Sequence, residues 1–186
     1  MSVSAIKKVL TFWFSVKPNY QLWYGGSPEL DLQIKNDFEP LYDQLASTKA
    51  PFDQSNEGIL ASIIVLDQFS RNMYRGTPKA FELDPFAVEL SLQVKDIWDY
   101  DASEKSFSLM PLLHSEDLSI HAISLEYFEK LKNKYPTPEH EKTYQYAIDH
   151  YKIVKRFGHY PHRNVILGRE SSQEEIDFLK EPGSSF

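Results

Sequence analysis

Three separated stretches of this sequence gather side chains that could bind an anion or move a proton. The stretch RFGHYPHRNVILGRESSQEE, residues 156–175, begins with two Arg, two His and one Asn within nine residues. Guanidinium groups bind carboxylate and phosphate well, and amide and imidazole groups add further donors. The candidate anion-binding residues here are Arg156, His162, Arg163 and Asn164. In the alternative interpretation, these side chains satisfy helix-end carbonyls and tie the loop to the protein.

The stretch LDQFSRNMYRG, residues 66–76, has an acid and two Arg at helical spacing. Asp67 and Arg71 are four residues apart, as are Arg71 and Arg75, so a helix would place each pair on one face. The guanidinium groups of the two Arg, together with Asp67 and Asn72, could form a site that donates several hydrogen bonds to a bound carboxylate or phosphate. The alternative is a salt bridge at a helix end, where Arg side chains also interact favourably with the helix dipole.

The stretch PLLHSEDL, residues 111–118, places one His beside two acids. His114 is a candidate acid or base, and Glu116 is the better partner to orient its imidazole. Asp117 fits better as a negative charge near a helix N-terminus. In the alternative interpretation the whole stretch caps a helix that begins after Ser115.

The sequence predicts no metal site and no cofactor. His159 and His162 could place two imidazoles on one ion, but a metal normally needs a third ligand at a recognisable spacing, and no H-E-x-x-H motif is present. The G-x-G-x-x-G, P-loop and G-x-S-x-G patterns are also missing.

The composition indicates an ordinary globular domain. A chain of 186 residues can bury a sizeable core, and we expect one domain over residues 1–186. The net charge of −7, without a long Lys or Arg run, argues against a nucleic-acid partner, because such proteins rely on a basic face. The absence of Cys excludes disulfides and thiolate chemistry.

The hydrophobic segments are too short to cross a membrane. Lys7 and Lys8 precede the apolar run VLTFWFSV, which resembles a short signal peptide but is followed by no small-residue cleavage site. An amphipathic first helix is the better interpretation. The apolar run at residues 59–66 is far below the roughly 20 residues that span a bilayer. We therefore expect a soluble, cytoplasmic protein without a membrane partner.

Capping residues and apolar spacing predict a series of helices. Pairs such as Ser27-Pro28, Asp84-Pro85 and Thr137-Pro138 are typical helix starts. Ser55 can cap the helix that carries the nearly continuous apolar run at residues 59–66, which we expect to be central and buried. Gly158 is typical of a helix end, and Ser172 with Glu175 fits a capping box. The expected helices cover about residues 3–15, 28–45, 56–70, 84–98, 116–133, 138–157 and 173–180. No segment alternates with a period of two, so we predict no sheet. The fold class is therefore all-α, a compact array of antiparallel helical hairpins.

The three stretches together resemble a known family. LDQFSRNMYRGTPKAF, PLLHSEDL and RFGHYPHRNVILGRESSQEEIDFL, with FWF and FLKEPGSSF near the two ends, resemble the signature blocks of domain of unknown function 924. The resemblance implies an all-α fold similar to the tetratricopeptide-like superfamily, but no reaction, substrate or cofactor. Ser70 stands where the family commonly has Pro, so the third helix should run longer here. His159-Tyr160 stands where Arg-Phe is frequent.

Two functions follow from these observations. In the first, residues 66–76, 111–117 and 156–169 form one cleft that binds a small anionic ligand and can carry out catalysis. Its anion donors would be Arg71, Arg75 and Arg163, with proton transfer at His114 or His162 and Glu116 as the orienting group. In the second, the polar stretches only brace a helical-repeat-like module that binds a protein or peptide.

Overall fold

The computed structural model describes residues 3–16 and 19–185, and this part of the chain contains helices and no strand. The prediction of an all-α array is confirmed, while the likeness to tetratricopeptide proteins stays a prediction. The helices are α1 (Val3–Phe14), α2 (Tyr20–Tyr24), α3 (Pro28–Thr48), α4 (Asn56–Ile63), η1 (Ile64–Phe69), α5 (Ser70–Met73), η2 (Pro78–Ala80), α6 (Asp84–Val94), α7 (Ala102–His114), α8 (Leu118–Lys134), α9 (Pro138–Phe157), η3 (Pro161–Arg163), α10 (Asn164–Leu167) and α11 (Gln173–Phe178).

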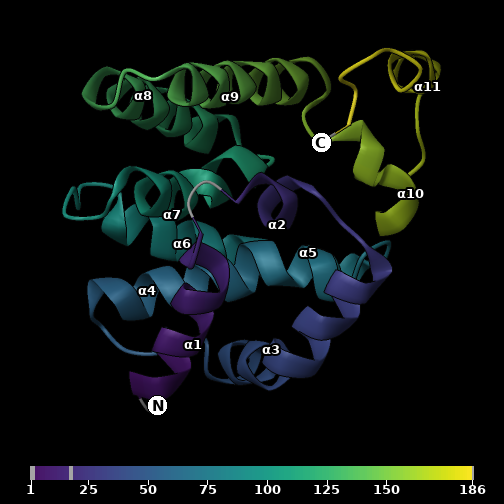
Figure 1. The fold of residues 1–186 in the computed structure, drawn as a ribbon. Coiled ribbons are helices and arrows are strands. Elements are labelled where there is room, and N and C mark those ends of the chain that lie inside the picture. Colours follow the sequence, from purple (N-terminus) through teal and green to yellow (C-terminus); the bar gives the residue numbers. More distant parts are fainter. Residues whose placement is uncertain (1–2, 17–18, 186) are drawn as a thin grey trace.

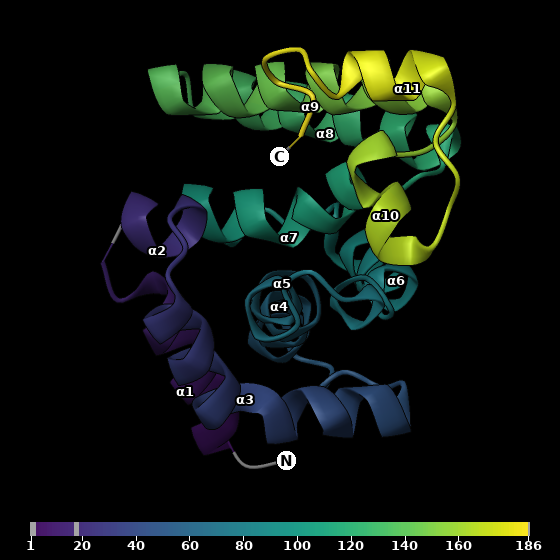
Figure 2. The same cartoon turned by 90° about the vertical axis from the view of Figure 1, so that its right-hand side faces the viewer.

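The segments α4, η1 and α5 form one continuous helical rod at the centre of the lower part of the molecule. Figure 2 shows this rod end-on, with α1, α3, α6 and α7 around it. Its apolar residues are almost completely buried, as the nearly continuous apolar run predicted. The rod continues to Met73, so it is longer than the range of residues 56–70 expected from its sequence.

The middle of the rod, η1, is a π-helix rather than an α-helix. The Ser70 N–H bonds to the carbonyl of Val65, five residues earlier. Two side chains complete the hydrogen bonding of this wide turn. Ser70 Oγ donates to the Leu66 carbonyl at 2.6 Å, and Arg71 Nη1 donates to the Asp67 carbonyl at 2.6 Å. The π-helix therefore places Asp67 and Arg71 in a locally widened part of the rod.

Several predicted helix ends are confirmed. Ser27, Ser55 and Thr137 each accept a hydrogen bond from a backbone N–H in the first turn of the following helix. Gly158 ends α9 in the left-handed conformation that glycine adopts easily. Ser172 begins α11 with a complete capping box.

The prediction that Ser115 caps a helix was wrong. An unpredicted helix, α7, ends at His114, and Ser115 follows it in an extended conformation. The N-cap of α8 is Asp117, whose carboxylate accepts from the Ser119 N–H. The sequence of α7 shows little periodicity because it is buried on nearly all sides, and its internal Pro111 resembles a helix stop.

Helix α7 lies between the central rod and an upper layer. Figure 1 shows this layer, which consists of the α8–α9 hairpin, with α10 and α11 at one end. Because α7 ends between these two layers, the His114 ring lies beside both the rod and α9. Within the described residues, no helix has the length and apolar character needed to cross a bilayer.

A buried lysine fastens α7 to the end of α6. The side chain of Lys105 is fully buried, and its ammonium group lies 4.7 Å from the Trp98 ring. It donates hydrogen bonds of 2.7–3.0 Å to the carbonyls of Val94, Lys95 and Ile97. These carbonyls lie at and just beyond the C-terminus of α6, where backbone acceptors lack intrahelical partners.

We predict that Lys105→Met lowers the free energy of unfolding by about 1–3 kcal/mol, because buried carbonyls lose their donor. Urea unfolding followed by circular dichroism measures this change. Lys152→Met is the matched control, because Lys152 is an exposed helical lysine with one surface ion pair. Equal stability of the two variants would contradict the role assigned to Lys105.

Candidate functional site

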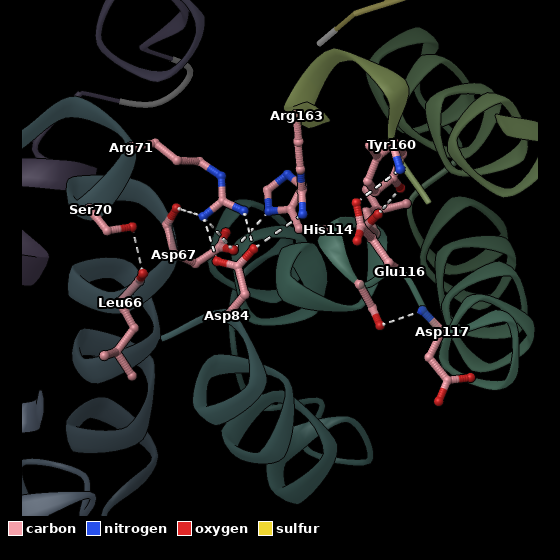
Figure 3. A network of polar contacts seen from close by, with 12 residues as sticks. Leu66, Asp67, Ser70, Arg71, Asp84, His114, Glu116, Asp117, Tyr160 and Arg163 are labelled. Carbon is pink, nitrogen blue, oxygen red and sulfur yellow. Dashed lines mark hydrogen bonds and ion pairs between the residues drawn. The ribbon is translucent and has the colours of Figure 1, made fainter. Parts of the chain in front are cut away.

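A buried carboxylate on the central rod orients His114. The side chain of Asp67 is fully buried, and its Oδ1 lies 2.7 Å from Nδ1 of His114 (Figure 3). Gln68 donates a second hydrogen bond to the other carboxylate oxygen at 2.6 Å. An ionised Asp can only accept, so we assign the ring proton of His114 to Nδ1. Nε2 then becomes the basic atom of the imidazole, and it has no hydrogen-bond partner among the described residues.

Arg71 joins Asp67 to a second carboxylate. Its two Nη atoms donate to the two oxygens of Asp84 at 3.1 and 3.0 Å, and Nη1 also lies 3.2 Å from Oδ1 of Asp67. This is a bidentate pair, the strongest geometry for Arg and carboxylate. Asp84 was expected as a helix cap. In the structure it is the first residue of α6, and its side chain turns toward Arg71 instead.

Arg163 approaches the same carboxylate from the other side. Its Nη1 lies 3.5 Å from Asp84 Oδ2, and its guanidinium group lies 4.6 Å from the ring centres of both Phe81 and Tyr160. Only 6% of Arg163 is exposed. Asp84 therefore connects the central rod to η3, and Arg163 fills the space between two rings.

The charges of this network balance one another. Burial alone would raise the pKa of Asp67, but Arg71 and His114 outweigh it and hold the pKa below its usual range. Burial, with the nearby charge of Asp67, raises the pKa of Asp84 despite Arg71. Burial, followed by the charge of Arg71, lowers the pKa of Arg163. Two carboxylates thus face two guanidinium groups beside the His114 ring.

Glu116 was expected to contact His114, but its carboxylate binds Tyr160 and Arg169 instead. It accepts a hydrogen bond from the Tyr160 N–H at 2.9 Å and two from Arg169, at 2.7 and 3.0 Å. These contacts outweigh the effect of burial and lower the pKa of Glu116. The expectation that Glu116 orients His114 is therefore corrected, because Asp67 is the carboxylate in contact with the ring. Arg169 lies within the polar stretch but was not singled out in the sequence.

A group of buried aromatic and imidazole rings surrounds Tyr160. Its hydroxyl donates to the Leu113 carbonyl at 2.5 Å, and its ring centre lies 5.7 Å from His150 and 5.5 Å from His162. Burial lowers the pKa of His150 to about 3, with the charges of His114, His121 and Arg163 acting in the same direction. Burial likewise lowers the pKa of His162 to about 4. Both imidazoles are therefore neutral at pH 7.

Arg75 and Asn72 bind the rod to α3. Asn72 Nδ2 donates to Asp31 Oδ1 at 2.8 Å, and Arg75 binds the same carboxylate through Nε at 2.7 Å and Nη2 at 2.9 Å. The Arg75 side chain is still 58% exposed. Its remaining Nη1 has no hydrogen-bond partner in the described part of the chain. Asp31 therefore holds the Arg75 guanidinium group in position, while its Nη1 stays available to a ligand.

Arg156 and Asn164 contact α11 instead of the His114 network. Arg156 Nε donates to Glu174 at 2.9 Å. Asn164 Nδ2 donates to Ser171 at 3.0 Å and to Glu175 at 3.2 Å. These contacts match the alternative interpretation of the last polar stretch, in which its side chains hold the final helix in place.

Two cavities border the network. The α6 cavity, of about 690 Å³, is lined by the start of α6, the segment between α7 and α8, and Arg163. The α2 cavity, of about 840 Å³, is lined by residues of α2, η1, α5, α7 and α9 and by Gly183 and Ser185. Among the described residues, His114 alone lines both cavities.

The two cavities differ in charge. Four carboxylates line the α6 cavity, together with Lys79 and Arg163; the four are Glu82, Asp84, Glu116 and Asp117. The α2 cavity has three cations and one carboxylate, namely Arg71, Arg75, Lys142 and Glu139. The α2 cavity is therefore the more cationic of the two. No group of three or more His, Asp and Glu that could hold a metal ion occurs within residues 3–16 and 19–185.

Comparison with known proteins agrees with this architecture. The family described as "Bacterial protein of unknown function (DUF924)" matches residues 9–183, and the chain belongs to this family. The structure is similar to that of a protein of unknown function from Agrobacterium tumefaciens, with a TM-score of 0.82 and 25% sequence identity. That match covers 97% of this chain and 99% of the other. No curated protein matches the chain.

We predict that Arg163→Ala lowers the free energy of unfolding by about 3–5 kcal/mol. The substitution removes one of the two guanidinium groups that compensate the buried negative charge of Asp84. Chemical denaturation measures this loss. Arg156→Ala is the matched control, since that Arg forms an exposed pair with Glu174, and its change should stay within about 0.5 kcal/mol. Similar values for the two variants would show that Arg163 does not brace the fold.

We also predict a loss of stability in mild acid. The pKa of His150 is about 3 in the folded protein, against about 6.5 in an unfolded chain. Between these values only the unfolded chain binds the proton, so the free energy of unfolding falls as the pH drops below about 6.5.

For His150 alone, the loss between pH 7.5 and pH 5 should be about 2 kcal/mol. Urea titrations of wild type and His150→Gln at both pH values measure it, and the variant should lose less than wild type. Identical pH dependence in the two proteins would contradict the prediction. His121 and His162 remain in both proteins, so the difference between them isolates His150.

Proposed function

We propose that the protein binds a small anionic molecule in the α2 cavity, with His114 at its wall as a proton donor or acceptor. The observation that carries this proposal is the excess of cationic side chains in a cavity of about 840 Å³, since small-molecule sites commonly measure about 300–1,000 Å³. The α6 cavity has the opposite charge and gives no comparable support.

Arg75 and Lys142 are the primary anion contacts in this proposal. Arg75 is fixed by Asp31 and keeps one Nη group accessible. Lys142 lies on α9 and forms no ion pair with a described carboxylate. Arg71 already uses both Nη groups on Asp67 and Asp84, so it contributes positive charge at the base of the cavity.

His114 and Asp67 supply the acid–base component. The neutral imidazole would accept a proton at Nε2 from a hydroxyl group of the ligand, and the Asp67 carboxylate would stabilise the imidazolium that forms. The 2.7 Å contact between the two side chains supports this assignment. Asp67 is a positioning residue, because its side chain is fully buried behind the ring.

The second candidate function is a protein- or peptide-binding module. It is favoured by the internal contacts of Arg156, Asn164, Glu116 and Arg163, which fit bracing roles. In that case the polar stretches would be structural throughout, and recognition would depend on another surface.

A thermal-shift titration tests the proposal. Phosphate, acetate and nucleotides are added to the wild-type protein, and an anion at a hundredfold excess over its dissociation constant should raise Tm by roughly 5–10 °C. Arg75→Ala and Lys142→Ala should reduce the shift, while Arg156→Ala, a control with a similar surface ion pair, should keep it. If no anion shifts Tm, or if all three variants respond like wild type, the α2 cavity is not an anion site.

A further inference from the structure

The α2 cavity has aromatic walls as well as cationic groups. Helix α2 is short, and its Trp23 anchors it by donating from Nε1 to the Trp13 carbonyl at 3.0 Å and by packing 4.9 Å from the Phe107 ring. Because Trp23 takes the buried position, the two tyrosines that flank it remain at the cavity. Tyr20 and Tyr24 lie one turn apart, and their rings stack with 6.2 Å between centres and an angle of 26°.

A third tyrosine lines the cavity from α9. Tyr146 is four residues from Lys142, so the two side chains share one face of the helix, and the ammonium group lies 5.5 Å from the ring centre. Tyr20, Tyr24 and Tyr146 are 52%, 59% and 40% exposed, respectively. Exposed aromatic side chains gathered around a cavity are typical of a binding site.

The floor of the cavity combines apolar and charged side chains. Phe107, Met110 and Leu113 of α7 line it together with Arg75. A ligand that buried only a phosphate or carboxylate would leave these apolar groups and the tyrosine rings without a partner. Both kinds of surface are used by a molecule in which a flat ring is joined to an anionic group.

We propose that the ligand of the α2 cavity carries a planar aromatic ring attached to a carboxylate or phosphate. The ring packs against Tyr20, Tyr24 and Tyr146, and the anion lies near Arg75 and Lys142. This inference rests on the proposed function and adds the chemical class of the ligand. Stacking on aromatic side chains should increase the affinity roughly tenfold, which corresponds to about 1.4 kcal/mol.

Matched probes test the ring without any substitution. Isothermal titration calorimetry compares phenyl phosphate with inorganic phosphate, and benzoate with cyclohexanecarboxylate, which has the same charge but no flat ring. We expect the aromatic member of each pair to bind about ten times more tightly. Equal affinities within both pairs would overturn the inference and leave the anion site intact. If none of the four compounds binds, the proposed function fails as well.

Variants then place the ring in the cavity. Tyr24→Leu and Tyr146→Leu should each weaken phenyl phosphate binding by about threefold, a part of the total tenfold gain, while inorganic phosphate binds as before. Tyr24→Phe and Tyr146→Phe keep the ring and should bind like wild type. Unchanged affinity in both Leu variants would show that the ring does not pack on these tyrosines. Phenol serves as a probe without charge, and binding of phenol as tight as that of phenyl phosphate would argue against the anion site.

Discussion

The structure depends on one buried carboxylate. Asp67 lies inside the central rod, where an ionised group is costly unless charged and polar partners compensate for its lost hydration. Arg71 and His114 supply this compensation, and Arg71 in turn fixes Asp84. These contacts bring the end of α7 and the start of α6 to one point on the rod. Neutralisation of this single side chain therefore joins α6 and α7 to the rod.

The side chains that bind Asp67 and Asp84 also line two cavities that differ in charge. Carboxylates predominate in the α6 cavity, whereas guanidinium and ammonium groups line the α2 cavity together with three tyrosines. The polar residues of the three stretches consequently have two kinds of surroundings. Arg163 and Glu116 bind internal partners, whereas Arg75 and His114 line the α2 cavity. Residue type alone does not separate the two groups, because arginine occurs in both.

Local signals in the sequence were sufficient for much of the fold. Capping residues such as Ser55 and Thr137 act within one turn, so the helix starts they mark were predictable. Helix α7 was missed because it is buried on nearly all sides and so has no amphipathic face, although Asp101 and Glu104 form a capping box at its start. The spacing of Asp67 and Arg71 indicated their pairing. Their link to Asp84 depends on packing between distant segments, and the role of Trp23 as an anchor for α2 has no local signature.

The π-helix η1 sets the direction in which the side chains that follow it point. A π turn accommodates one residue more than an α turn, so the side chains after it are rotated by about 100° relative to an uninterrupted helix. Arg71, Asn72 and Arg75 all lie just beyond this point. The direction in which they face is thus set by a single extra residue in η1. If η1 were α-helical, Arg71 and Asn72 would be turned by more than a quarter of a turn, away from Asp84 and Asp31, the carboxylates that they now bind.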